Sequence, residues 1–159
     1  MEPIRVVWGT ATALTAMGSY DGALAAAGIE NYNLVQVSSV VPAGASVAAV
    51  GTAPDLGPAG ERLTVVEARA TVAPDEAGPA CAGLGWALEE SGRGIFYEAS
   101  GTEPDAVRDA VREGRATGER LREWSFSARD ERFATLEAPD DAHTTAVVAA
   151  VYGSSEPLL

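Results

Sequence analysis

The segment 31–44, "NYNLVQVSSVVPAG", decides how this chain is to be understood. Apolar residues before and after its centre predict a buried strand, and Pro42 with Gly44 ends the run. Ser38 and Ser39 interrupt this strand with two hydroxyl groups, each of which needs a hydrogen-bond partner if it is buried. One interpretation is a turn or a bulge between two short strands. The other is that the serine pair is a reactive site.

Two adjacent serines can cleave their own chain. On a strained backbone, the Ser39 hydroxyl attacks the Ser38 carbonyl and converts the amide into an ester. β-Elimination then breaks the chain and leaves dehydroalanine at position 39, which hydrolyses to a pyruvoyl group and ammonia. A pyruvoyl carbonyl condenses with amines and accepts the electrons that a decarboxylation releases, as pyridoxal phosphate does.

The scarce residue types exclude most other chemistry on amines. The 11 basic residues are all arginines, and without lysine the chain can form neither a pyridoxal phosphate Schiff base nor a Walker phosphate loop. A single cysteine, Cys81, excludes an internal disulfide and cysteine-based metal clusters. The single histidine, His143, lies in the polar stretch "DDAHTTAV", which favours a solvated loop histidine over a catalytic one. We expect no pyridoxal phosphate and no metal.

Net charge and hydropathy limit the classes of partner that the chain can bind. The 23 acidic residues give the 159-residue chain a net charge of −12, which repels nucleic-acid phosphates and predicts no nucleic-acid binding. Such a surface suits a cationic ligand, or a salt-rich cytoplasm in which the repulsion is screened. No apolar run is long enough to span a membrane, and the start "MEPIRVVWG" has no leader-like pattern. The sequence therefore predicts a cytoplasmic protein without membrane contact.

The local patterns predict one domain, residues 1–159, of the α/β (α+β) class. A short helix is expected at 19–28, with Ser19 as its cap, Asp21 in its first turn and Gly28 at its end. A longer amphipathic helix is expected at 102–124. The remaining expected strands are 4–11, 63–71, 82–89, 92–100, 132–138 and 144–153. A long loop or helical turn is expected at 42–62 and a loop at 73–81.

The stretch "SYDGALAAAGIENYNLVQVSSVVPAGA" (19–45) resembles the pyruvoyl-dependent arginine decarboxylases. Their pattern joins an acidic residue on a helix, an "AGI" helix end and a strand with paired serines. The segments 51–70, 94–100 and "TAVVAAVYG" look like the same family, so the resemblance covers nearly the whole chain. It implies a layered αββα sandwich and a trimer of self-cleaved chains, 1–38 and 39–159, with active sites between neighbours.

The resemblance also implies roles for single residues. Ser39 would become the covalent pyruvoyl cofactor, and Ser38 the carboxyl end of the smaller chain. Asn33 would position groups during cleavage or catalysis, although a turn asparagine is the alternative. Glu98 would protonate the carbanion after carbon dioxide leaves, and burial would raise the pKa of a glutamate in that role. Its alternative is an outward-facing strand residue.

The substrate expected from the resemblance is an amino acid, arginine, which would become agmatine in polyamine synthesis. Asp21 would pair with the substrate guanidinium, with a helix cap as the alternative, and Leu24 would line the aliphatic stem or belong to the core. The stretch "LTAMGSY" (14–20) lacks further acidic residues, so the chemistry is better supported than arginine itself. Aspartate decarboxylation, or an uncleaved non-catalytic subunit of the same fold, remains the alternative.

Overall fold

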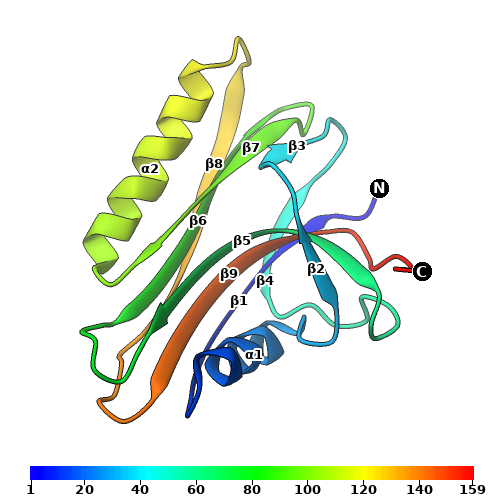
Figure 1. Cartoon of the computed structure of the whole chain (residues 1–159). Helices are drawn as coiled ribbons and strands as arrows, with labels where there is room; N and C mark the ends of the chain where they lie inside the picture. The colour runs from blue at the N-terminus through cyan, green and yellow to red at the C-terminus, as the bar shows by residue number, and fades with distance from the viewer.

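The computed structural model describes the whole chain, residues 1–159, as nine strands and two helices. In chain order these are β1 (Ile4–Ala13), α1 (Ala16–Ala27), β2 (Asn33–Gln36), β3 (Val40–Val41), β4 (Val47–Gly51), β5 (Arg62–Val72), β6 (Ala80–Glu89), β7 (Gly94–Gly101), α2 (Pro104–Arg120), β8 (Phe126–Leu136) and β9 (His143–Tyr152). The strands form two stacked sheets with one helix on the outer side of each (Figure 1). Neither helix is long and apolar enough to cross a membrane.

The five-stranded sheet has the order β2-β5-β9-β1-β4. Its central strand, β9, pairs antiparallel with β5 and β1, and the edge strands β2 and β4 run parallel to β5 and β1. The residues of β9 from Thr144 to Val151 are all buried. A continuous run of small apolar residues is what a strand covered on both faces requires.

The four-stranded sheet has the order β3-β7-β6-β8, and every neighbouring pair is antiparallel. Its central strand, β6, is buried along most of its length. Gly85 leaves space for α2 to approach, because a Cβ atom there would lie 2.7 Å from Val111 Cγ1. The missing side chain therefore sets how closely the helix packs on this sheet.

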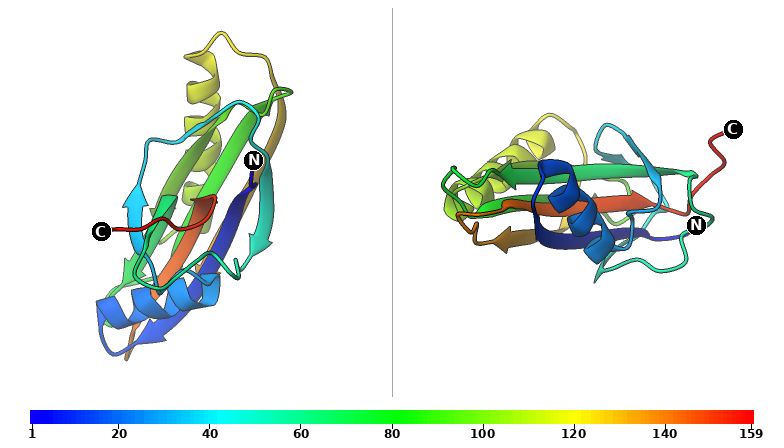
Figure 2. Two further views of the ribbon diagram at one scale, coloured as in Figure 1. Left: turned by 90° about the vertical axis from the view of Figure 1, so that its right-hand side faces the viewer. Right: turned by 60° about the horizontal axis from the view of Figure 1, so that its bottom comes forward.

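Two apolar cores join three of the four layers, and buried residues of α2 attach the fourth. The first lies between the sheets, where residues such as Phe96 and Val148 meet. The second lies between α1 and the five-stranded sheet and includes Ala23 and Val147. On the opposite side, α2 covers the four-stranded sheet through buried residues such as Val111 (Figure 2). The layer order of helix, sheet, sheet, helix confirms the predicted αββα sandwich.

The first helix begins earlier than the sequence predicts. Its cap is Thr15, whose hydroxyl accepts a hydrogen bond from a backbone N–H of the first turn at 3.0 Å. The predicted cap, Ser19, is buried inside the helix, and its hydroxyl lies 2.7 Å from Thr145 Oγ1 of β9. Asp21 therefore lies beyond the first turn, so its predicted place there and the capping alternative are both wrong. Gly28 ends the helix as predicted, with a left-handed φ of 82°.

Two other segments differ from their prediction, and one agrees with it. The glycine-rich stretch 42–62 contains β4, which forms only because it pairs with the distant strand β1. The strand predicted at 132–138 begins earlier, at Phe126, where it pairs with β6. The helix predicted at 102–124 is confirmed as α2.

The segment 31–44 does not form one strand. Its first part, β2, belongs to the five-stranded sheet, and its second part, β3, belongs to the four-stranded sheet. Residues 37–39 carry the chain from one sheet to the other (Figure 1). The prediction of a single strand is therefore wrong, and the alternative of a turn between two short strands describes the backbone.

Candidate active site

The backbone bends sharply at the serine pair. The Val40 N–H donates a hydrogen bond of 2.6 Å to the carbonyl oxygen of Ser38, which closes a γ-turn centred on Ser39. The Phe96 N–H of β7 donates to the Ser39 carbonyl oxygen at 2.8 Å. Both carbonyl groups beside the Ser38–Ser39 linkage are thus held by backbone donors.

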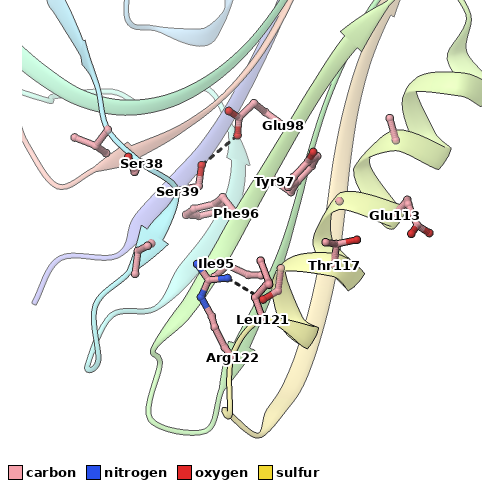
Figure 3. A pocket seen from close by; sticks show the side chains of 15 residues that line it. Ser38, Ser39, Ile95, Phe96, Tyr97, Glu98, Glu113, Thr117, Leu121 and Arg122 are labelled. Atoms are coloured by element: carbon pink, nitrogen blue, oxygen red, sulfur yellow. Dashed lines mark hydrogen bonds between the residues drawn. The ribbon is translucent and has the colours of Figure 1, made fainter.

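The Ser39 hydroxyl points toward the carboxylate of Glu98. Ser39 Oγ donates a hydrogen bond of 3.2 Å to Glu98 Oε2, and the two side chains face each other across the gap between residue 39 and β7 (Figure 3). Glu98 is exposed in the single chain. The burial that the sequence analysis expected for Glu98 is therefore not provided by one copy of the protein.

These residues border a cavity of about 890 Å³ between β7, α2 and the bend at residues 37–40. Gly114 and Gly118 of α2 line it, and they are the two glycines that interrupt the apolar stripe of this helix. A Cβ atom at Gly114 would lie 2.0 Å from Tyr97 Cε1. Gly114 therefore lets the Tyr97 ring lie between β7 and α2, a role that the sequence alone did not reveal.

Asn33 lies apart from this cavity. It is the first residue of β2, and its side-chain Nδ2 donates a hydrogen bond of 2.7 Å to the Gly60 carbonyl oxygen. This bond resembles the turn role that the sequence analysis kept as the alternative for Asn33. The amide oxygen of the side chain remains exposed to solvent on this face.

Asp21 and Leu24 lie on the other side of the molecule. Both belong to α1, which covers the outer face of the five-stranded sheet, whereas the cavity lies beside α2. Leu24 is 7% exposed and packs in the core beneath α1, as its alternative role predicted. Asp21 is exposed. One chain brings Ser38, Ser39 and Glu98 together, but it does not bring Asp21, Leu24 or Asn33 to the same cavity.

The sequence model of the family described as pyruvoyl-dependent arginine decarboxylase (PvlArgDC) matches residues 3–157. The chain belongs to this family. Pyruvoyl-dependent arginine decarboxylases of Halobacterium salinarum strains R1 and NRC-1 are each 49% identical to it over 159 residues, which is 99% of this chain and 98% of the relative. These similarities confirm the resemblance inferred from the segment around the serine pair.

As a member of the pyruvoyl-dependent arginine decarboxylases, the chain requires a pyruvoyl group, and the geometry at residues 38–40 suits one. The Ser39 hydroxyl bonds to a carboxylate, and one backbone N–H bonds to the carbonyl of each of the two peptide linkages that flank Ser39. No group of three or more His, Cys, Asp or Glu side chains that could hold a metal ion occurs in the structure.

Tyr152 also belongs to the site of this member of the decarboxylase family, although the sequence alone did not indicate it. Tyr152 is the last residue of β9, and its hydroxyl donates a hydrogen bond of 3.0 Å to the Val40 carbonyl oxygen. Burial, together with the nearby charge of Glu98, raises the pKa of Tyr152 to about 12. The sequence feature that could have pointed to Tyr152 is that a large aromatic residue ends a strand of small apolar residues in "TAVVAAVYG".

Proposed function

We propose that this chain cleaves itself between Ser38 and Ser39, forms a pyruvoyl group at residue 39, and decarboxylates arginine to agmatine and carbon dioxide. The observation that carries the proposal is the 3.2 Å contact between Ser39 Oγ and Glu98 Oε2, beside the bent Ser38–Ser39 peptide. Membership of the pyruvoyl-dependent arginine decarboxylases supports the reaction. The hydroxyl at the bend supports Ser39 as the source of the pyruvoyl group.

The cleavage proceeds in steps that balance. Ser39 Oγ bonds to the Ser38 carbonyl carbon, its proton passes to the Ser39 nitrogen, and the carbon–nitrogen bond breaks to give an ester. Loss of the Ser39 α-proton and of the ester carboxylate then separates residues 1–38 from residues 39–159. Water replaces the remaining nitrogen, which leaves as ammonia. Glu98 supports the first step because its carboxylate accepts the hydrogen bond of the attacking hydroxyl.

The residues around the cleaved end then serve the decarboxylation. When present, a pyruvoyl group supplies a carbonyl that condenses with the substrate amine and withdraws electrons as carbon dioxide leaves. Glu98 delivers a proton to the carbon that has lost carbon dioxide, because no other carboxylate contacts residue 39. The Phe96 N–H fixes the direction of the residue 39 carbonyl relative to β7.

The substrate guanidinium is assigned to Asp21 of a neighbouring copy. Asp21 is the only charged side chain of α1, it is exposed, and it has no ion-pair partner within the chain. A carboxylate with no internal partner is suited to a charge-assisted hydrogen bond with a cation from outside. An aspartate substrate would be repelled there, which favours arginine over aspartate.

A trimer with sites between neighbours explains why the proposed residues are divided between two faces of one chain. The apolar side chains beside the serine pair are unusually open to solvent: Val37 is 40% exposed and Val40 is 45% exposed. Their burial by a second copy would be favourable. In such an assembly, the Asn33 amide and the Leu24 region of one copy approach the serine end of the next. We propose this arrangement for Asn33, Asp21 and Leu24.

Two measurements on the purified protein test the proposal. Mass spectrometry should find fragments 1–38 and 39–159, and the larger one should resist Edman sequencing because its first residue carries no amine. Carbon dioxide release should be fastest with arginine among arginine, lysine, ornithine and aspartate. A chain that stays intact and inactive would show a non-catalytic subunit, whereas faster release from aspartate would keep the chemistry and overturn the substrate.

A further inference from the structure

Val40 follows the proposed cleavage site and faces Ile95 of β7 as a non-hydrogen-bonded pair of the antiparallel ladder. Its N–H and its carbonyl oxygen therefore point away from β7 and find other partners. The Val40 N–H donates to the Ser38 carbonyl oxygen at 2.6 Å, and its own carbonyl oxygen accepts the Tyr152 hydroxyl at 3.0 Å. The Tyr152 bond orients the peptide group that follows Val40, whereas the Phe96 bond to the Ser39 carbonyl orients the peptide group that carries the Val40 N–H. Tyr152 therefore acts on the Val40 N–H through the two backbone dihedrals of Val40.

Tyr152 is itself held from two sides. It ends β9 in the five-stranded sheet, and it is partly buried against the core between the sheets. Its ring meets the Phe96 ring edge-to-face, with centroids 6.1 Å apart. Phe96 also provides the N–H that bonds to the Ser39 carbonyl. The donors to the carbonyls of residues 39 and 40 thus come from two aromatic residues in mutual contact.

The hydroxyl of Tyr152 is suited to permanent donation. Its pKa of about 12, raised by burial and then by Glu98, keeps it protonated near neutral pH. A protonated O–H group can donate to a carbonyl oxygen without interruption.

We propose that Tyr152 is a positioning residue for self-cleavage, which holds the Val40 carbonyl so that the Val40 N–H is aimed at the Ser38 carbonyl oxygen. The inference rests on the self-cleavage proposed above. When Ser39 Oγ bonds to the Ser38 carbonyl carbon, the electron pair of the C=O bond moves onto the Ser38 oxygen. The Val40 N–H is the donor that the structure places at this oxygen, and a fixed donor stabilises the developing charge. Collapse of that charge then expels the Ser39 nitrogen.

The test is the rate of cleavage in Tyr152→Phe, which keeps the ring contact with Phe96 and removes only the hydroxyl. Full-length chains made by cell-free synthesis are sampled over time by denaturing electrophoresis. The matched control is Tyr32→Phe, because the Tyr32 hydroxyl also donates to a backbone carbonyl, that of Gly57 at 2.8 Å, away from the serine pair. We expect Tyr152→Phe to be cleaved about three- to tenfold more slowly than wild type, and Tyr32→Phe at the wild-type rate.

A second measurement separates positioning from general loss of structure. In a Ser39→Ala background, where no chain is cut, adding Tyr152→Phe should change the melting temperature no more than adding Tyr32→Phe. If wild type is cleaved and Tyr152→Phe is cleaved at the same rate, the positioning role alone is overturned. Slower cleavage accompanied by a larger fall in melting temperature than in the control would also overturn it. An uncleaved wild type would instead contradict the self-cleavage, and this inference with it.

Discussion

The two outer helices cover their sheets in different ways. α1 packs on the five-stranded sheet through alanines, Leu24 and a buried serine, and Asp21 is its only charged residue. α2 is strongly charged and is tied to β8 by ion pairs such as Arg112–Glu131 and Arg129–Glu119. Eight of the eleven arginines lie between residues 93 and 132, in the half of the molecule that contains α2.

This difference indicates a division of labour. Every charged side chain of α2 has an ion-pair partner, and the proposed chemistry lies in the same half of the molecule, at Ser39 and Glu98. In the α1 half, the helix needs no charge for its packing, and the exposed Asp21 has no ion-pair partner in the chain, which leaves it available for the proposed contact with a substrate cation. Substitutions near β7 should therefore change cleavage or turnover, whereas substitutions on the exposed face of α1 should change substrate affinity.

The largest expected effect follows replacement of the attacking group. Ser39→Ala should remain a single chain and release no carbon dioxide, because no hydroxyl is available to attack the Ser38 carbonyl. Ser38→Ala is the matched control, since the mechanism uses only the carbonyl of residue 38. Mass spectrometry of both variants decides the point, and a cleaved Ser39→Ala chain would assign the reaction to another residue.

Glu98→Gln separates cleavage from turnover. Glutamine can still accept the Ser39 hydrogen bond through its carbonyl oxygen, so the chain should still be cut. It cannot deliver a proton, and the turnover number should fall by about 10²- to 10⁴-fold. Near-normal turnover in the fully cleaved variant would show that another group is the acid.

Asp21→Asn tests the half of the molecule that carries no chemistry. Loss of one hydrogen bond to a charged group corresponds to roughly 1.5–3 kcal/mol, so the KM for arginine should rise about tenfold or more. Cleavage should be unchanged, because Asp21 lies on α1, away from the serine pair. Glu30→Gln is a suitable control, as another exposed acid beyond the end of α1. An unchanged KM for Asp21→Asn would remove Asp21 from the substrate site.

The smallest expected effects concern two glutamates, one in each half, with opposite pKa shifts. Burial raises the pKa of Glu67 on β5 above its usual 4.5, although the Tyr20 hydroxyl bonded to it partly offsets this. The native state therefore holds this proton more tightly than the unfolded state, and stability falls as pH rises from about 4.5 through the native pKa. Glu67→Gln should abolish that fall, while its amide oxygen keeps the bond from Tyr20.

Glu119 on α2 should show the reverse. A hydrogen bond from Arg129, with a further contribution from Arg115, lowers its pKa. Its stabilisation is fully present above about pH 4.5 and is lost as pH falls through the lowered native pKa. Melting temperatures between about pH 3 and about pH 7 should therefore converge for wild type and Glu119→Gln at the acid end. If the melting temperatures of Glu67→Gln and Glu119→Gln each ran parallel to those of wild type over this pH range, the assigned pKa shifts would be contradicted.

The sequence predicted the parts of this structure that depend on local pattern or on resemblance. The helix end at Gly28 and the helix α2 were predictable in this way, and the two residues given roles by the resemblance, Ser39 and Glu98, do lie in contact. The cap at Thr15 was missed because Ser19 is an equally good cap by type, and only its contact with Thr145 on a distant strand shows that it is buried.

The remaining features depend on contacts between distant segments. The sequence around the serines cannot show that β2 and β3 belong to different sheets, because their partners lie in β5 and β7. Likewise, Tyr152 follows Val40 by more than a hundred positions, and no local pattern joins them. From the sequence, Gly114 only interrupts the apolar stripe of its helix. Its role depends on the Tyr97 ring of β7, which lies where a side chain at residue 114 would be.

The position of the crossing between the sheets has a consequence for the lifetime of the protein. A cut between residues 38 and 39 leaves β1, α1 and β2 on a separate chain, with β1 inserted between β9 and β4 of the other. Under the proposed self-cleavage, the reacting groups meet only in the folded molecule, so each chain would fold once as a single piece and then be divided. After any later unfolding, recovery requires two different molecules to collide, and its rate should fall on dilution. The intact Ser39→Ala chain would still refold its own sandwich by a unimolecular route.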